Sequence, residues 1–479
     1  EWADQLLREL GRQAVLGAGP DVGGALEWLG RRIGAEVALI GPDGAVEAAT
    51  GGFPPGLPEA LGPLLGRLAG GEMAAAATEV GGWRLRCEAL GQGVPRRVLV
   101  VAGAEAPDPE AGRLISRTGG MVTLLQGLTE ARAAARAYHR KAAQVRLAVF
   151  MALMAGDPTL ARRVTAGAMP ALLRAASLRV LLLRCEPDER DRLAQRYQDP
   201  AGFHGPGLLV RCPVYEEHLI CLIPEGTAEG DELTARLAAL VREHPGYALG
   251  VSAALPQRAT AEAYDQARHA LAVARNSRER VVGYQGQDPL EALLPSEQAQ
   301  AWARSFLRPL GVVPKLTVDV TRLALTFPRA GVARLLGISR NTVTAHLRDV
   351  ERALGLDLRD VGSRASLALA LAVAVPRADD ESEPPRTLEE LLRTPAAVAW
   401  ARALLDPLRH SGHPELRATL SAWIDANADA QRTAHRLGIS RNTVRSRLRA
   451  AERLLGRDLL STGAGVHDLV HALRATAPS

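Results

Sequence analysis

The chain has 479 residues, 47% of them apolar, and at roughly 150 residues per domain this length predicts about three to five domains. Its formal net charge is +5, and almost all of its positive side chains are arginines, since Lys141 and Lys315 are the only lysines. The longest uncharged apolar run, at 366–376, is about half of the ~20 residues that a membrane-spanning helix needs. These properties, together with the lack of a recognisable leader, favour a cytoplasmic protein and exclude a membrane protein.

The first 125 residues are expected to form a small domain of helices and strands. Helices are expected over 3–16 and 21–33, followed by two strands joined by the Pro-Asp-Gly turn in EVALIGPDGAVEAAT. The segments WRLRCEAL and RRVLVVAG predict two further strands. This pattern resembles a GAF-like sensor domain at 1–125, which implies a variable ligand pocket without naming the ligand.

A long helix is expected over 109–154, because only scattered glycines interrupt its helical pattern. Such a helix commonly transmits a signal between a sensor and an effector domain, or pairs with its twin in a second chain. We therefore expect residues 126–174 to form a helical connector and the protein to form a homodimer.

Residues 175–290 alternate strands and helices around a central hairpin, in the manner of an α+β domain. The order resembles a diguanylate-cyclase-like domain. In an active cyclase the hairpin tip reads GGDEF, with glycines that admit the nucleotide and carboxylates that hold metal. Here YEEHL at 215–219 stands in that place, with Tyr215 and Glu216 for the glycines and His218 for a carboxylate. The domain is therefore expected to be degenerate, with no catalytic residue, metal or cofactor, and YEEHL to form a solvated turn.

The four cysteines lack the CxxC spacing of a zinc site and are expected to be buried thiols. They are Cys87, Cys185, Cys212 and Cys221. If the hairpin turned at Glu216 and Glu217, Cys212 and Cys221 would lie opposite each other, which is a weak indication of a redox pair.

Two stretches near the end of the chain are almost the same. LGISRNTVTAHLRDVERALGLDL at 336–358 and LGISRNTVRSRLRAAERLLGRDL at 437–459 share 16 of 23 residues. In the second stretch, apolar residues at steps of four, three and four predict a helix over 441–455, with Ser440 as its N-cap and Gly456 after its end. A short helix ending at Gly438 precedes it, so the order is that of a helix-turn-helix.

Each repeat is a whole domain, because AWARSFLRPL at 301–310 also matches AWARALLDPL at 399–408. The domains are expected at 296–375 and 396–479. The segment 376–395 between them begins with the acidic, proline-rich PRADDESEPPR and is expected to be a linker.

The outward positions of both long helices carry residue types that bind DNA. Arginine reads guanine, asparagine reads adenine, and hydroxyl groups bind phosphates. The second helix is the more basic, with five arginines and Glu452 between 441 and 453. The candidate DNA-binding residues are Ser339, Arg340, Asn341, Thr342, Thr344, Ala345 and Arg348 in the first copy, and Ser440, Arg441, Asn442, Thr443, Arg445, Ser446, Arg447 and Arg449 in the second.

The block ISRNTV, followed by RL or HL, ER, LG and DL, resembles the C-terminal helix-turn-helix of PucR/CdaR-type bacterial transcription regulators. Those regulators commonly carry a histidine before the RNT triplet, where this chain has Ser339 and Ser440, and they usually carry the domain once. The resemblance implies a sequence-specific transcription regulator that binds double-stranded DNA through two tandem reading heads. It also implies a multidomain α+β fold with a GAF-like sensor, a degenerate cyclase-like domain and two all-α helix-turn-helix domains.

Two points stay open at the level of sequence. One is whether an unidentified small-molecule effector binds the N-terminal half. The other is an alternative function, a nucleotide-handling signalling enzyme or a ligand sensor in which the helix-turn-helix units mediate assembly only.

Overall fold

The computed structural model describes residues 22–165, 171–197, 206–374, 386–410, 412–461 and 463–477. The chain divides into two compact units, residues 1–140 and 141–479, and each is described by itself. The helix expected at 3–16 lies outside the described residues, as does most of the acidic segment 376–386. Within the described part, no helix is both long enough and apolar enough to cross a bilayer.

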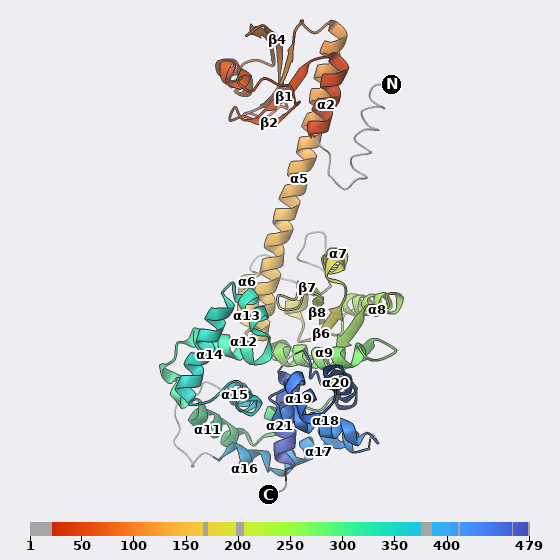
Figure 1. The fold of residues 1–479 in the computed structure, drawn as a ribbon, viewed down its shortest axis with the longest axis vertical. Helices are drawn as coiled ribbons and strands as arrows, with labels where there is room; N and C mark the ends of the chain where they lie inside the picture. The colour runs from red at the N-terminus through yellow and green to blue at the C-terminus, as the bar shows by residue number, and fades with distance from the viewer. Residues whose placement is uncertain are drawn as a thin grey trace. The chain divides into compact units, whose positions relative to one another are not determined.

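The N-terminal unit is built on a five-stranded antiparallel sheet in the order β2-β1-β5-β4-β3 (Figure 1). Alternate residues of β1 enter different cores: Val37 and Leu39 pack with helix α2 and the start of helix α5, and Ala38 and Ile40 pack with helices α3 and α4. The strands are β1 Glu36–Ile40, β2 Val46–Ala49, β3 Ala75–Val80, β4 Trp83–Leu90 and β5 Arg97–Gly103. The helices are α2 Val22–Ile33, α3 Leu57–Ala60, α4 Gly62–Ala69 and α5 Pro109–Met154.

The four strands and the helix expected in this unit after residue 20 are all present, and α5 has the bounds that the sequence predicts. Strand β3 was not expected. Its residues, AAATEV, are mostly small and give little of the alternation that marks a strand, but they pair with β4 along its length.

The C-terminal unit begins with a six-stranded sheet in the order β11-β9-β6-β8-β7, with β10 paired to β6. Val180 and Leu182 of β6 face the end of α5 and helix α9, whereas Leu181 and Leu183 face helices α7 and α8. The strands are β6 Ser177–Arg184, β7 Leu208–Arg211, β8 His218–Pro224, β9 Ala248–Val251, β10 Leu255–Pro256 and β11 Val281–Gly283. The helices are α6 Pro158–Val164, α7 Pro187–Tyr197, α8 Ala228–Glu243 and α9 Thr260–Ala274.

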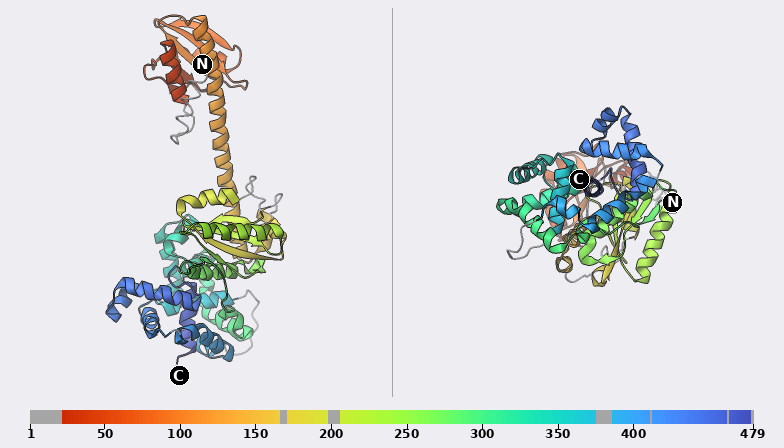
Figure 2. Two further views of the ribbon diagram at one scale, coloured as in Figure 1. Left: turned by 90° about the vertical axis from the view of Figure 1, so that its right-hand side faces the viewer. Right: turned by 90° about the horizontal axis from the view of Figure 1, so that it is seen from below.

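Helix α9 approaches the sheet very closely. A Cβ atom on Gly250 of β9 would lie 2.1 Å from the carbonyl oxygen of Ala267, so only glycine fits at this crossing. The other side of α9 is turned toward the helix-turn-helix region, as both side views show (Figures 1 and 2). The helix therefore lies between the sheet and the helix-turn-helix region.

The register of the central hairpin shows that its turn is not at Glu216 and Glu217. Leu209 of β7 lies opposite Cys221, and the amide of Cys212 donates to the carbonyl oxygen of His218 over 3.0 Å. The loop therefore spans 213–217 and is centred on Tyr215, so Cys212 and Cys221 are not opposite each other. All four cysteines are free and buried, as expected, and burial raises their pKa values, that of Cys87 to about 11 and that of Cys185 to about 12.

The rest of the unit is helical and repeats one arrangement twice. The first copy comprises α11 Ser296–Leu307, α12 Lys315–Thr326, α13 Arg329–Leu336, α14 Arg340–Leu354 and α15 Val361–Val373. The second comprises α17 Pro395–His410, α18 Pro414–Asp425, α19 Ala430–Leu437, α20 Arg441–Leu455 and α21 Ala464–Ala475. The short helices α10 Leu290–Leu293 and α16 Leu388–Leu392 lie before each copy.

The two copies share a hydrophobic core. Helix α15 points Leu367 and Leu371 into the core of its own copy, whereas its Ala365 and Leu369 pack with residues of α17 and α21 in the second copy. Trp302 of α11 lies in this shared core together with Trp400 of α17. The two copies are therefore held together as one body.

Part of the segment assigned to the linker belongs to this body. Residues 388–392 form α16, which begins with a capping box between Thr387 and Glu390 and buries its three leucines. The three leucines of LEELL form an apolar face that can pack against the core. The acidic segment 376–386 before them has no such face.

Candidate nucleic-acid interface

The second helix-turn-helix is built by local signals at its turn. Gly438 has a φ of 65° and closes α19, because the left-handed conformation there is open to glycine at little cost. The hydroxyl oxygen of Ser440 then accepts a hydrogen bond from the amide of Thr443 over 3.0 Å and caps α20. Gly337 and Ser339 do the same in the first copy. The second recognition helix, α20, begins and ends where the sequence predicts, and the first, α14, has the equivalent bounds.

The inward faces of both helices are the expected ones. Val444, Leu448, Ala451 and Leu455 are buried in the second copy. Val343, Leu347 and Val350 are buried in the first, where Leu354 is partly buried against the same core. Each helix is thus fixed by one apolar stripe, which leaves the opposite face to solvent.

Most candidate DNA-binding residues lie on that solvent face. The exposed ones are Ser339, Arg340, Asn341, Thr342, Ala345 and Arg348 on the first copy, and Ser440, Arg441, Asn442, Arg445, Ser446 and Arg449 on the second. Thr344, Thr443 and Arg447 are half-buried. Arg447 donates to the hydroxyl oxygen of Thr419 over 3.2 Å, so it is tied to α18 and only borders the exposed face.

The two exposed faces differ in whether their arginines form ion pairs. Within the described residues, Arg441, Arg445 and Arg449 of α20 form no ion pair. On α14, Arg352 lies 3.3 Å from Asp349, so part of its charge is compensated. That pair lies in the last turn of α14, and in the half of α14 before it Thr344 stands where α20 has Arg445. The second recognition helix therefore presents more positive charge in its N-terminal half, the part that contacts DNA in such motifs.

Glu452 is not a surface charge, although its place among arginines suggested one. Its side chain is only 1% exposed, and Oε1 accepts hydrogen bonds from the amides of Leu459 and Leu460 at 3.0 and 3.1 Å. Burial, followed by the nearby Asp458, raises the pKa of Glu452 to about 7. Glu351 plays the same part in the first copy, where it accepts from Leu358 over 2.9 Å. The glutamate of the ER pair in each repeat therefore fixes the turn after the recognition helix.

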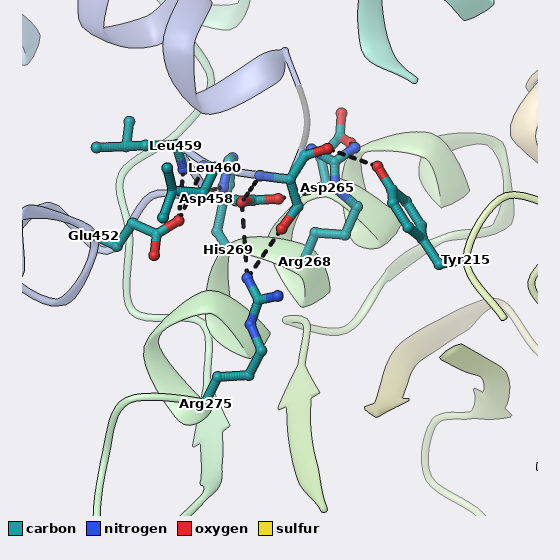
Figure 3. A network of polar contacts seen from close by, with 10 residues as sticks. Tyr215, Asp265, Arg268, His269, Arg275, Glu452, Asp458, Leu459 and Leu460 are labelled. Carbon is teal, nitrogen blue, oxygen red and sulfur yellow. Dashed lines mark hydrogen bonds and ion pairs between the residues drawn. The ribbon is translucent and has the colours of Figure 1, made fainter. Parts of the chain in front are cut away.

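The end of α20 is anchored to the domain of the six-stranded sheet by a buried polar network (Figure 3). The amide of Asp458 donates to Nδ1 of His269 over 3.0 Å, and its carboxylate lies 3.9 Å from Nε of Arg268 and 4.0 Å from Nη2 of Arg275. Asp458 and Arg268 are 2% and 3% exposed, so the charges are removed from water together. Burial, followed by Arg457 and Arg268, lowers the pKa of His269 and keeps its ring neutral, as the accepted hydrogen bond requires.

The hairpin tip contacts both copies, which corrects the expectation of a solvated turn. The phenol of Tyr215 donates to the carbonyl oxygen of Ser461 over 2.6 Å, and Glu216 lies 2.7 Å from Arg334 of α13. Val214 packs against Gly331, where a Cβ atom would approach it to 2.4 Å. The second copy has Arg432 at the position equivalent to Gly331. The glycine that makes room for the hairpin is therefore present in the first copy and absent from the second.

The first copy lacks the anchor that holds the second. Asp357, at the position equivalent to Asp458, is exposed and pairs only with Arg359 within the described residues. The domain of the six-stranded sheet thus holds the first copy through α13 and the second through the turn after α20. Sequence reasoning missed these contacts, since residues far apart along the chain make them.

Comparison with known proteins agrees with this geometry. The model of the PucR C-terminal helix-turn-helix domain matches the chain twice, at residues 325–373 and 416–475. An uncharacterised protein encoded in the pkwA 5' region of Thermomonospora curvata is 42% identical over 107 residues, which are 22% of this chain and 59% of that protein. The chain thus matches little more than half the length of this relative. No solved structure matches the chain. The C-terminal half of the chain carries two copies of the PucR C-terminal helix-turn-helix domain.

Proposed function

We propose that the protein is a sequence-specific DNA-binding transcription regulator with two reading heads, α14 and α20, fixed to each other within one chain. The observation that carries the proposal is the N-terminal half of α20, whose exposed Arg441, Arg445 and Arg449 have no acidic partner in the described structure. Side chains of this kind at the start of a recognition helix suit base edges and phosphates of the major groove. A regulator with one head must form a dimer to bind two half-sites. The core shared by the two copies supports the second step of the proposal, in which two heads of one chain bind two half-sites without a dimer.

We expect the full chain to bind a duplex that it selects from a random-sequence pool, with a strong dependence on salt. If about four phosphates are contacted, affinity should fall roughly a hundredfold between ~50 and ~200 mM salt, because condensed counterions are released. The double change Arg441→Gln and Arg445→Gln should flatten this dependence. The same change at Arg402 and Arg409, which are exposed on α17, serves as the matched control. If no sequence is enriched, or if the binding does not respond to salt, the helix-turn-helix copies serve assembly and the proposal is wrong.

The N-terminal half is proposed to sense and to dimerise. The antiparallel sheet of the first unit, with helices on both faces, supports a GAF-like sensor for an unidentified effector. Helix α5 exposes Leu124, Leu128 and Tyr138 by 66, 51 and 52%, which supports pairing with a second chain. Light scattering tests this part, since a particle of one 50.9 kDa chain would contradict the dimer.

The cyclase-like domain is proposed to be a docking domain without catalytic activity. Two-metal phosphoryl chemistry needs paired carboxylates on an open hairpin tip, but here Tyr215 and Val214 of that tip contact the helix-turn-helix copies. Purified protein incubated with GTP and magnesium should give no cyclic dinucleotide. A product that disappears in Glu217→Ala would contradict this expectation, whereas nucleotide binding without turnover would not.

A further inference from the structure

A cleft of about 580 Å³ lies between the two helix-turn-helix copies, beside the start of α20. Arg441 and Arg445 of α20 line one side, together with the start of α19. The other side is formed by the first copy, through the end of α12, the residues 327–328 after it, and Arg364 of α15. Three arginines from two copies of the domain therefore share one cleft.

The positive charge of this cleft is poorly compensated. Asp429 is its acidic lining residue, and that carboxylate already caps α19, where it accepts from the amides of Gln431 and Arg432 at 2.8 and 2.9 Å. His467 adds no charge at neutral pH, because burial lowers its pKa to about 3. The three arginines of the cleft therefore outnumber its acidic lining residue, and the cleft keeps a net positive charge.

Arg364 is the least expected of the three arginines, since it lies on no recognition helix. Its Nε is buried and has no hydrogen-bond partner within the described residues. Burial lowers the pKa of Arg364, while the nearby Asp360 raises it and the nearby Arg329 lowers it. A partly desolvated guanidinium whose Nε has no hydrogen-bond partner within the described residues gains from an anion that can accept its donors in a planar fork.

We propose that this cleft binds a phosphate group, and that the group is a backbone phosphate of the DNA strand that α20 reads. The proposal rests on the proposed function and deepens it, because it makes the first copy contribute Arg364 to the DNA contact of the second. The cleft lies at the starts of α19 and α20, the two helix ends that a helix-turn-helix places against the duplex. A free phosphate compound would be recognised by the same chemistry.

The test compares Arg364→Gln, Arg364→Lys and the control Arg359→Gln in the full chain. Arg359 also belongs to the first copy, but its side chain is 84% exposed and lies outside the cleft. With the duplex selected by the wild type, Arg364→Gln should reduce the slope of log K against log salt by about 0.9, the value for one phosphate contact. Arg364→Lys should keep the slope because it keeps the charge, and Arg359→Gln should match the wild type. Thermal unfolding of each variant checks that the fold is intact.

A second arm measures the binding of inorganic phosphate and pyrophosphate to the same proteins by calorimetry without DNA. Loss of this binding in Arg364→Gln, with an unchanged DNA slope, would assign the cleft to a free phosphate compound. An unchanged slope with no phosphate binding, or tighter DNA binding by Arg364→Gln, would overturn the proposal. If the wild type selects no DNA, the proposed function fails, and the calorimetric arm alone decides whether the cleft binds phosphate.

Discussion

Glu452→Ala should destabilise the second helix-turn-helix by about 3 kcal/mol, because it removes the acceptor of two amides at once. Each buried amide left without a partner costs about 1 to 3 kcal/mol. The matched control is Glu351→Ala in the first copy, where the half-buried carboxylate accepts a single amide, that of Leu358. We expect that change to cost about 1 kcal/mol. Hydrogen exchange of the Leu459 and Leu460 amides measures the effect locally, and equal losses of protection in the two copies would contradict it.

Glu452 should also make the stability of this turn depend on pH. Its folded pKa of about 7 lies above the model value of 4.5, so the folded state holds a proton that the unfolded chain has released. The stabilisation is complete below pH 4.5 and is lost as the pH rises to about 7. A shift of this size corresponds to about 3 kcal/mol across the range.

The isosteric change Glu452→Gln keeps the acceptor oxygen and removes the titration. The variant should therefore protect the Leu459 and Leu460 amides equally at pH 5 and pH 8, whereas the wild type should lose protection at the higher pH. If the wild type and the variant show the same pH dependence, Glu452 does not carry this titration.

Local signals predicted the recognition helices well, and non-local contacts explain what was missed. The bounds of α20 follow from Ser440, Gly456 and an apolar stripe, all of which act within the helix or next to it. The burial of Glu452 depends instead on how residues 459–460 fold back against the helix, and a pattern of charges does not show this. Periodicity therefore places a helix and its apolar face, but it does not show which charged residue turns inward.

The central hairpin gives the same lesson for register and docking. Its strands were expected, but the turn is centred on Tyr215 and not between Glu216 and Glu217. This shift changes every cross-strand pair, so Cys212 lies opposite His218 and not opposite Cys221. The contacts of Val214, Tyr215 and Glu216 with the two helical copies depend on residues more than a hundred positions away. In the same way, Arg364 joins Arg441 only because the two copies pack together.

Asn442→Ala should weaken binding to the selected duplex by about 1 to 3 kcal/mol, or roughly five- to 150-fold, if Asn442 reads an adenine edge. Asn341→Ala, the same change at the equivalent position of the first copy, should cost less. The second helix carries Arg445 and Ser446 where the first has Thr344 and Ala345, so it brings more positive charge to the phosphates around its half-site.

The difference between the copies also concerns their attachment. The turn after α20 is fixed by the buried Asp458, so α20 is held at its C-terminal end. The equivalent Asp357 is exposed, and the domain of the six-stranded sheet holds the first copy through Arg334 and Gly331 of α13. In such motifs this helix crosses the DNA backbone. Under the proposed function, we therefore expect the first head to meet DNA with less charge and with one face of α13 already occupied.

Because the two exposed faces differ in sequence, the two half-sites should differ as well, and the selected operator should be asymmetric. The paired variants Arg340→Ala and Arg441→Ala make the same comparison between the two copies for contacts with phosphates. Arg441→Ala should weaken DNA binding more than Arg340→Ala. Footprinting of the wild type on the selected duplex gives an independent reading of the site. Equal losses from the two copies, or a perfectly palindromic footprint, would show that the heads are equivalent, while leaving DNA binding itself in place.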